Sequence, residues 1–198
     1  MKDRKNGAIK TLKPAVALFA LLWVITAIIY PLTVFAVGRI LFPAQSQGSL
    51  IYDKNGDVIG STLIGQSFTG EKYFWSRPSA TSGFPYNSLS SSGSNLGPTS
   101  RILVEGVYNR TRLFMLANGV SYVPSDAVMS SASGLDPHIS LMSAQMQAQR
   151  VAKARGMEID TVNRIVQKHT EYPLFGVLGE ERVNVLLLNQ ALDDSEHT

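Results

Sequence analysis

The chain has 198 residues, no cysteine and a formal net charge of +3. The absence of cysteine excludes disulfides, thiolate metal sites and cysteine nucleophiles. The positive charge does not indicate nucleic-acid binding, because from Gln45 onward 14 acidic residues face 12 basic ones, and these basic residues are scattered. A nucleic-acid-binding domain needs a concentrated basic surface, so no nucleic-acid partner is expected.

A transmembrane helix is predicted over residues 15–41, because no charged side chain occurs between Ala15 and Gly38. At 1.5 Å per residue the uncharged stretch from Ala15 to Gly38 alone covers about 36 Å, enough for a hydrocarbon core of ~30 Å. Pro31 removes one backbone donor and should kink this helix. The alternative is a cleaved signal peptide, but apolar regions of signal peptides run to only about 15 residues, which favours the permanent anchor.

The charges that flank this segment predict its orientation. Five basic residues precede it (Lys2, Arg4, Lys5, Lys10 and Lys13), whereas only Arg39 follows closely. Basic residues favour the cytoplasmic side of a membrane. We therefore expect residues 1–14 to form a cytoplasmic tail, and residues 45–198 to form one domain outside the cytoplasm, anchored in the inner membrane.

This domain begins with a β-hairpin pattern. Residues 48–52 and 57–64 are strand-like, and Asn55-Gly56 between them favours a tight hairpin turn. Residues 72–100 show neither helical nor strand periodicity but contain five aromatic side chains. Such composition predicts an ordered irregular segment held by its aromatic residues, rather than disorder.

Helical patterns follow over residues 101–116, 141–155, about 160–168 and 183–192. In the first, one face carries Leu103, Val104, Val107, Tyr108 and Thr111. Ser140 is the predicted N-cap of the second helix, and Gly156 its end. An early hairpin followed by several helices predicts the α+β class.

Motifs for catalysis are scarce in this sequence. It contains no phosphate-binding loop of the Walker type and no His-Glu-x-x-His zinc motif, so no metal or cofactor site is predicted in this chain. Ser133, Asp136 and His138 carry the groups of a serine hydrolase, but three residues on one short turn generally cannot converge as a triad. A structural turn, with Asp136 bonding backbone ahead of Pro137, is favoured.

Many short segments, taken in order along the chain, match one pattern. They include Tyr30-Pro31, Gly48-Ser-Leu-Ile51, Leu63-Ile-Gly-Gln66, Arg77-Pro-Ser-Ala80, Gly93-Ser-Asn-Leu-Gly-Pro98, Ala132-Ser-Gly-Leu-Asp-Pro-His-Ile-Ser140, Arg150-Val-Ala-Lys-Ala-Arg-Gly156, His169-Thr-Glu171, Leu178-Gly-Glu180 and Arg182-Val-Asn-Val185. Each is weak alone, but their collinear order across nearly the whole chain is specific. Together they resemble the KdpC family, the accessory subunits of Kdp-type potassium-transporting ATPases.

The resemblance implies a non-catalytic accessory subunit of an inner-membrane complex that imports K⁺ with the energy of ATP. Its expected partners are a P-type ATPase subunit, a channel-like potassium-binding subunit, a small single-pass subunit and membrane lipid. The family is often described as a catalytic chaperone that raises the ATP affinity of the pump. ATP and Mg would then be bound in the partner ATPase subunit, and with the topology above the effect would be indirect.

Seven residues are candidates for partner contact, since aromatic and arginine side chains are enriched at interface hot spots. These are Tyr73, Phe74, Trp75, Arg77, Asn95, Asp136 and His138. Filling the domain's own core is an equally good interpretation of the aromatic residues. Two other functions remain open at this point: an anchored extracytoplasmic enzyme that uses Ser133, Asp136 and His138, and an anchored sensor or solute-binding module.

Overall fold

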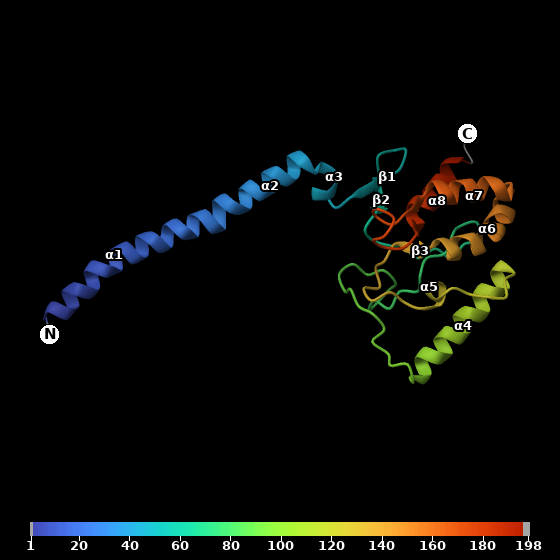
Figure 1. The fold of residues 1–198 in the computed structure, drawn as a ribbon, viewed down its shortest axis with the longest axis horizontal. Helices are drawn as coiled ribbons and strands as arrows, with labels where there is room; N and C mark the ends of the chain where they lie inside the picture. The colour runs from blue at the N-terminus through green and yellow to red at the C-terminus, as the bar shows by residue number, and fades with distance from the viewer. Residues whose placement is uncertain (1, 196–198) are drawn as a thin grey trace. The chain divides into compact units, whose positions relative to one another are not determined.

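The computed structural model describes residues 2–195, with side chains described from Leu12 onward. The chain divides into two compact units, which meet in sequence between Ser49 and Leu50. The first contains the apolar helix, and the second contains a β-hairpin, a three-stranded sheet and five helices (Figure 1). The predicted α+β class and the single apolar helix before the folded unit are thereby confirmed.

The first unit is a nearly continuous helix made of α1 (Lys2–Val24), a π-helical turn (Ile25–Ile29) and α2 (Tyr30–Leu41), followed by the short α3 (Pro43–Ser46). By length and composition, Leu12–Leu41 is the one described helix that could cross a membrane, and an 18-residue stretch of it has a mean hydropathy of 2.4. The helix therefore extends well beyond the predicted segment 15–41 on its N-terminal side.

The π-helical turn lies directly before Pro31. The Tyr30 N–H donates to the Ile25 carbonyl five residues back. Proline lacks a donor, and its ring would clash with the carbonyl four residues before it, so a wider turn at this point relieves the conflict. Thr26 and Thr33 donate their hydroxyls to the carbonyls of Leu22 and Ile29, each at 2.8 Å, which satisfies both polar groups inside the apolar segment.

The second unit opens with the predicted hairpin, β1 (Leu50–Tyr52) and β2 (Val58–Ser61), paired antiparallel. Its turn is organised by Asp53, whose carboxylate accepts from the N–H groups of Asn55 and Asp57 at 2.9 and 2.8 Å. These bonds lower the pKa of Asp53, the one from Asp57 contributing most.

A three-stranded antiparallel sheet follows later in the chain, in the order β3 (His138–Ser140), β5 (Arg182–Asn184), β4 (Thr170–Glu171). Ile139 and Val183 pair and point into the core, so His138, Arg182 and Glu171 fall on the opposite face. Sequence analysis missed this sheet, because strands of two or three residues are too short to show alternation.

The helices of this unit are α4 (Arg101–Asn118), α5 (Ser125–Val128), α6 (Leu141–Arg155), α7 (Ile159–Lys168) and α8 (Val185–Ser195). The predicted caps of α6 are confirmed: the Ser140 hydroxyl accepts from Ser143 N–H, and Gly156 ends the helix at a φ of +65°. The prediction that the last helix starts at Val183 was wrong, since Val183 pairs in β5. Of the five residues predicted to share one face of α4, Leu103, Val107 and Thr111 are half-buried, whereas Val104 and Tyr108 are exposed.

The core lies between α6, α7, α8 and the inner face of the sheet. Figure 1 shows these three helices together, with α4 set apart beyond α5. Small residues of α6 allow α7 to approach closely, and valine and leucine side chains fill the remaining space. The buried cluster consists of Phe74, Ile139, Ala144, Ala148, Val151, Ala152, Val162, Val166, Val183, Val185, Leu188 and Leu192.

The long connection from β2 to α4, residues 62–100, contains no helix or strand but is extensively hydrogen bonded. Asn189 brackets Phe74, accepting from its N–H at 2.8 Å and donating to its carbonyl at 3.0 Å. Gln147 does the same for Trp75. The expected ordered irregular segment is therefore present, but buried amide side chains hold it as much as its aromatic residues do.

Candidate functional site

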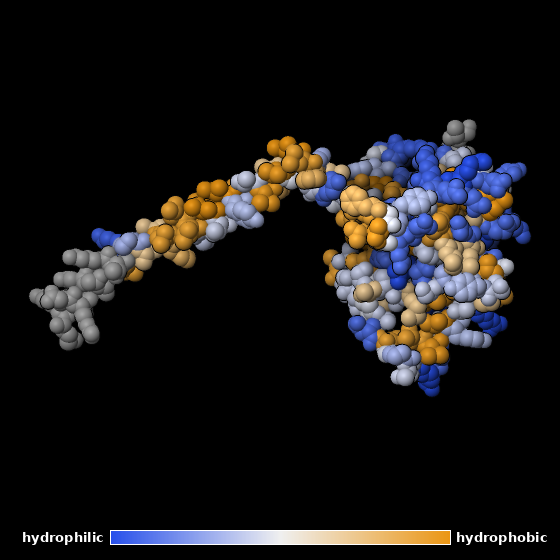
Figure 2. Space-filling view, viewed as in Figure 1, coloured by the Kyte–Doolittle hydropathy of each residue, from blue (hydrophilic) through white to orange (hydrophobic). Residues whose placement is uncertain are grey.

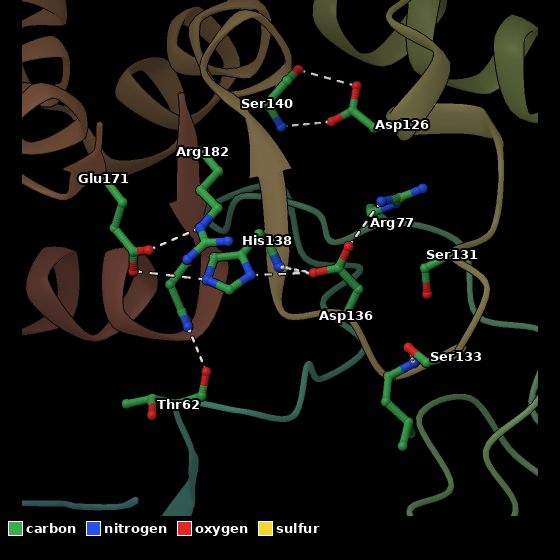
Figure 3. Close-up of polar contacts among 12 residues, drawn as sticks. Thr62, Arg77, Asp126, Ser131, Ser133, Asp136, His138, Ser140, Glu171 and Arg182 are labelled. Carbon is green, nitrogen blue, oxygen red and sulfur yellow. Dashed lines mark hydrogen bonds and ion pairs between the residues drawn. The ribbon is translucent and has the colours of Figure 1, made fainter. Parts of the chain in front are cut away.

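A chain of charged side chains crosses the outer face of the three-stranded sheet (Figure 3). An Arg77 Nη1 donates to Asp136 at 2.8 Å, and the other oxygen of Asp136 lies 3.2 Å from His138 Nδ1. His138 Nε2 lies 3.7 Å from Glu171, which accepts from Arg182 Nε at 2.9 Å. We call Arg77, Asp136, His138, Glu171 and Arg182 the polar network.

The local sequence explains how the network is placed. Asp136 precedes Pro137, which favours an extended backbone at residue 136, and its carboxylate accepts from the His138 N–H at 3.0 Å. This turn starts β3 with His138 directed outward. Glu171 and Arg182 stand directly opposite each other in the register of β4 and β5, where opposite charges stabilise the pairing.

Arg77 comes from the irregular segment and is positioned by Tyr86. The Tyr86 hydroxyl donates to the Arg77 carbonyl at 2.6 Å. Burial raises the pKa of Tyr86 to about 12, so this donor stays protonated at any physiological pH. Gly65 lies against the Tyr86 ring, where a Cβ would come within 2.4 Å of a ring carbon.

The pKa of Asp136 lies below its ordinary value. Burial alone would raise it, but hydrogen bonds from His138 and the positive charge of Arg77 together outweigh burial. Asp136 is therefore a carboxylate at neutral pH. The network thus carries two carboxylates and two guanidinium groups, with the imidazole between the carboxylates.

The network borders a shallow depression of about 560 Å³. Four carboxylates and two guanidinium groups line it, so its charge is predominantly negative. Its charged lining residues are Arg77, Asp126, Asp136, Glu180, Glu181 and Arg182. Asp126 also accepts from the N–H and hydroxyl of Ser140, at 2.7 and 3.0 Å, which fixes the start of α6 at its edge (Figure 3).

The three aromatic candidates differ in accessibility. Phe74 has no exposed surface and belongs to the core, so its prediction as a partner-contact residue was wrong, because its side chain fills the space between the helices. Tyr73 and Trp75 are half-buried. The Tyr73 hydroxyl lies 3.3 Å from Asp193, and the Trp75 ring stacks on the Arg150 guanidinium, 4.3 Å from its centroid.

The other candidates divide between the depression and a separate loop. Arg77, Asp136 and His138 all line the depression, and Asp136 contacts each of the other two, so the structure brings these three together. Asn95 is exposed, with a left-handed φ of +51°, and is not among the lining residues. Of the seven predicted residues, Arg77, Asp136 and His138 line the depression. The three aromatic residues do not line it, and Asn95 is separate from both groups.

A hydrolase triad is not assembled. The Ser133 hydroxyl accepts from the Leu135 N–H at 3.1 Å, whereas His138 Nδ1 faces Asp136 (Figure 3). Ser133 does not line the depression that Asp136 and His138 share. Over the described residues, no three His, Asp or Glu side chains are placed to hold a metal ion. This geometry supports a binding surface and does not support acyl-transfer chemistry.

Sequence reasoning missed Glu171 and Arg182 as site residues. Their contribution depends on the pairing of β4 with β5, and such short strands give no periodic signal. The one available signal was that Glu171 and Arg182 carry opposite charges on either side of residues 172–181. This signal predicts no contact until the two strands are known to be neighbours.

Comparison with known proteins identifies the family of this chain. A family model described as K+-transporting ATPase, c chain (KdpC), matches residues 12–194. The chain belongs to the KdpC family. The "Potassium-transporting ATPase KdpC subunit" of Herminiimonas arsenicoxydans is 48% identical over 185 residues, covering 92% of this chain and 97% of that protein. The proteins of the same name from Variovorax paradoxus (strain S110) and Dechloromonas aromatica (strain RCB) are each 50% identical, over 93% and 92% of this chain and 96% of each relative.

The KdpC match covers both units of the chain, including the helix from Leu12 and every residue of the polar network. The resemblance drawn from short sequence segments is confirmed. An apolar helix long enough to span a bilayer, in a family of transport-ATPase subunits, agrees with a membrane location.

Proposed function

We propose that this chain is the accessory subunit of an ATP-driven potassium import complex. The observation that carries the proposal is the KdpC match over residues 12–194, together with relatives named as KdpC subunits along nearly their whole length. The partners would be the P-type ATPase subunit, the channel-like potassium-binding subunit and the small single-pass subunit.

The proposed arrangement has the helix in the inner membrane, the N-terminus in the cytoplasm and the second unit outside. The support is the excess of basic residues before the uncharged segment Ala15–Gly38 over the single Arg39 directly after it. The helix would pack against partner helices and lipid. Because only a few residues separate Leu41 from Leu50, the second unit would stay within reach of the exported faces of these partners.

The polar network is the proposed contact surface for the partner that carries the ion. The depression beside it has more carboxylates than guanidinium groups, and a negative surface raises the local concentration of cations. A position over the ion entrance of the channel-like subunit fits this charge. Trp75, with its guanidinium-stacked ring, and Tyr73 remain candidates for the same interface.

An effect on ATP use would be indirect in this arrangement. ATP and Mg would be bound by the ATPase subunit on the cytoplasmic side, where only the N-terminal tail of this chain would lie. An accessory protein can still alter ATP affinity if it binds one conformation of the pump more tightly than the other.

The first test is a tagged pull-down of the full chain from potassium-starved membranes in mild detergent, with the co-purifying proteins identified. Co-purification of a P-type ATPase subunit and a channel-like membrane subunit is the expected result. Recovery of the chain alone would contradict the proposed function.

Orientation has its own test, because the chain contains no natural cysteine. Cysteine at Asn55, in the exposed hairpin turn, should react with a membrane-impermeant maleimide in intact cells. Cysteine at Asn6 is the matched control and should react only after lysis. The reverse pattern would overturn the proposed orientation.

A further inference from the structure

The loop that joins β4 to β5 exposes an unusual amount of apolar surface. Within seven consecutive residues, five large apolar side chains are each more than 60% exposed. They are Tyr172, Leu174, Phe175, Val177 and Leu178, and Phe175 is 87% exposed. In the space-filling view apolar surface lies over this loop, which Figure 1 colours orange-red (Figure 2). We call residues 172–178 the apolar tip.

The apolar tip is built as a tight hairpin. Leu174 and Leu178 exchange backbone hydrogen bonds at 2.9 and 3.0 Å, and the Gly176 N–H donates to the Pro173 carbonyl at 3.0 Å. Phe175 and Gly176 both adopt left-handed backbone, at φ +55° and +73°. The hairpin therefore presents its apolar side chains to the outside in one defined arrangement.

Left-handed backbone is unfavourable for phenylalanine, since its Cβ crowds the following carbonyl. Here that unfavourable conformation does not bring the ring into the core, because Phe175 is almost fully exposed. A strained residue that displays a large apolar group outward is a feature of binding sites. Contiguous apolar surface on a folded protein likewise marks an interaction surface.

The charges beside the tip indicate which kind of partner covers it. Glu171 precedes it, Glu180 and Glu181 follow it, and no lysine or arginine occurs between His169 and Arg182. Arg182 is itself paired with Glu171 at 2.9 Å. An anionic bilayer surface attracts basic segments and repels acidic ones, so this tip is poorly suited to lipid. Two copies meeting tip to tip would bring their glutamates together, which is also unfavourable.

We propose that the apolar tip inserts into an apolar hollow, rimmed by basic side chains, on the exported face of a membrane subunit in the transport complex. This inference rests on the proposed function and adds the segment that makes the contact. The strands flanking the tip also carry Glu171 and Arg182 of the polar network. The contact would thus have an apolar centre with charged residues at its edge, as protein interfaces generally do.

Photo-crosslinking tests the partner directly. Phe175 is replaced by the photoreactive p-benzoylphenylalanine in the tagged full chain, which is expressed with the whole complex and irradiated in native membranes. The expected product is a covalent adduct with a membrane subunit of the complex. Leu89, which is 94% exposed on another loop, is the matched control position and should give at most a trace of that adduct. Adducts only with lipid, only with a second copy, or only at the control level would overturn the proposal.

A substitution tests the energetic contribution. Phe175→Asn removes the ring while keeping a residue that tolerates left-handed backbone, so folding should be preserved. Loss of an interface hot spot should lower the retention of partner subunits roughly tenfold after a detergent wash. Leu89→Asn, the control, should retain them like the unmodified chain, and unchanged tryptophan fluorescence of both variants checks the fold.

The outcomes separate the two proposals. If the unmodified chain captures the transport subunits and Phe175→Asn captures them equally well, only the role of the apolar tip fails. If the unmodified chain captures none of them, the proposed function fails, and the apolar tip loses its partner with it.

Discussion

Arg150 provides the sharpest test of how the irregular segment is held in place. Its guanidinium, on the buried side of α6, stacks 4.3 Å from the Trp75 ring centroid. Burial lowers its pKa to about 10, an effect that nearby Glu71 partly offsets. It donates five hydrogen bonds. Three go to backbone carbonyls of residues 62–100, namely Gly70 O at 3.3 Å, Glu71 O and Tyr73 O at 3.0 Å. The other two go to Asn118 Oδ1 and Gln147 Oε1, each at 2.9 Å.

Arg150→Met keeps an apolar stem but removes all five donors. A hydrogen bond from a charged group contributes about 1.5–3 kcal/mol, but the five are not additive. Removing the guanidinium also removes the cost of burying its charge. We therefore expect the free energy of unfolding to fall by about 3 kcal/mol, a large part of the ~5–15 kcal/mol typical of a domain. Arg150→Lys keeps the charge but loses the planar guanidinium with its several donors, and should lower the free energy of unfolding by about half as much.

The assay is guanidinium unfolding of the full chain in detergent, followed by tryptophan fluorescence. Trp23 lies in the apolar helix and Trp75 beside Arg150, so a Trp23→Phe background leaves one reporter in the segment of interest. Arg164→Met is the matched control, because Arg164 is exposed on α7. Its loss should stay within about 0.5 kcal/mol. If Arg150→Met cost less than about 1 kcal/mol, the backbone path itself, and not Arg150, would hold the segment.

Two further predictions concern the polar network and the packing around Gly134. Asp136→Asn should lower the free energy of unfolding by about 1–2 kcal/mol at pH 7. The pKa of Asp136 in the folded state is depressed below 3.8. The stability contributed by the Asp136 carboxylate is therefore present above about pH 4 and is lost as the pH falls through the folded-state pKa. Unfolding titrations at pH 7 and at several values below about pH 4 check this, and a loss that does not shrink as the pH falls would show that the carboxylate charge is not responsible. Gly134→Ala should destabilise by about 2–4 kcal/mol, since Gly134 has a φ of +67° and a Cβ would lie 2.6 Å from Ser92 O and 2.7 Å from Thr81 Cγ2. Gly97→Ala, whose Cβ would meet nothing within 4 Å, is the control, and equal Tm values for the two variants would contradict the packing argument.

Much of the fold could be predicted from the sequence because it depends on local signals. The hairpin at Asn55-Gly56, the N-cap at Ser140 and the glycine end at Gly156 each use interactions between residues close in the chain. The three-stranded sheet could not be predicted in this way. Its first strand, β3, pairs with β5 from far along the chain, and all three strands are too short for a periodic pattern.

The candidate site was predictable in smaller part. Asp136 and His138 are neighbours in sequence, so their contact follows from one turn, whereas Arg77 joins them across 59 residues. Phe74 and Trp75 are adjacent and both aromatic, yet one is buried and the other half-buried. Composition cannot distinguish them, because the difference is tertiary: the Phe74 ring packs in the core cluster, whereas the Trp75 ring stacks on the Arg150 guanidinium.

The sequence by itself determined the apolar helix, the α+β class and the family, because uninterrupted hydropathy, local turn and cap residues, and collinear segments are properties of the chain alone. The tertiary structure decided which charged residues form the polar network and that residues 172–178 stay exposed. Both depend on which strands pair and which side chains the core can accept, and these contacts between distant residues have no counterpart in local sequence.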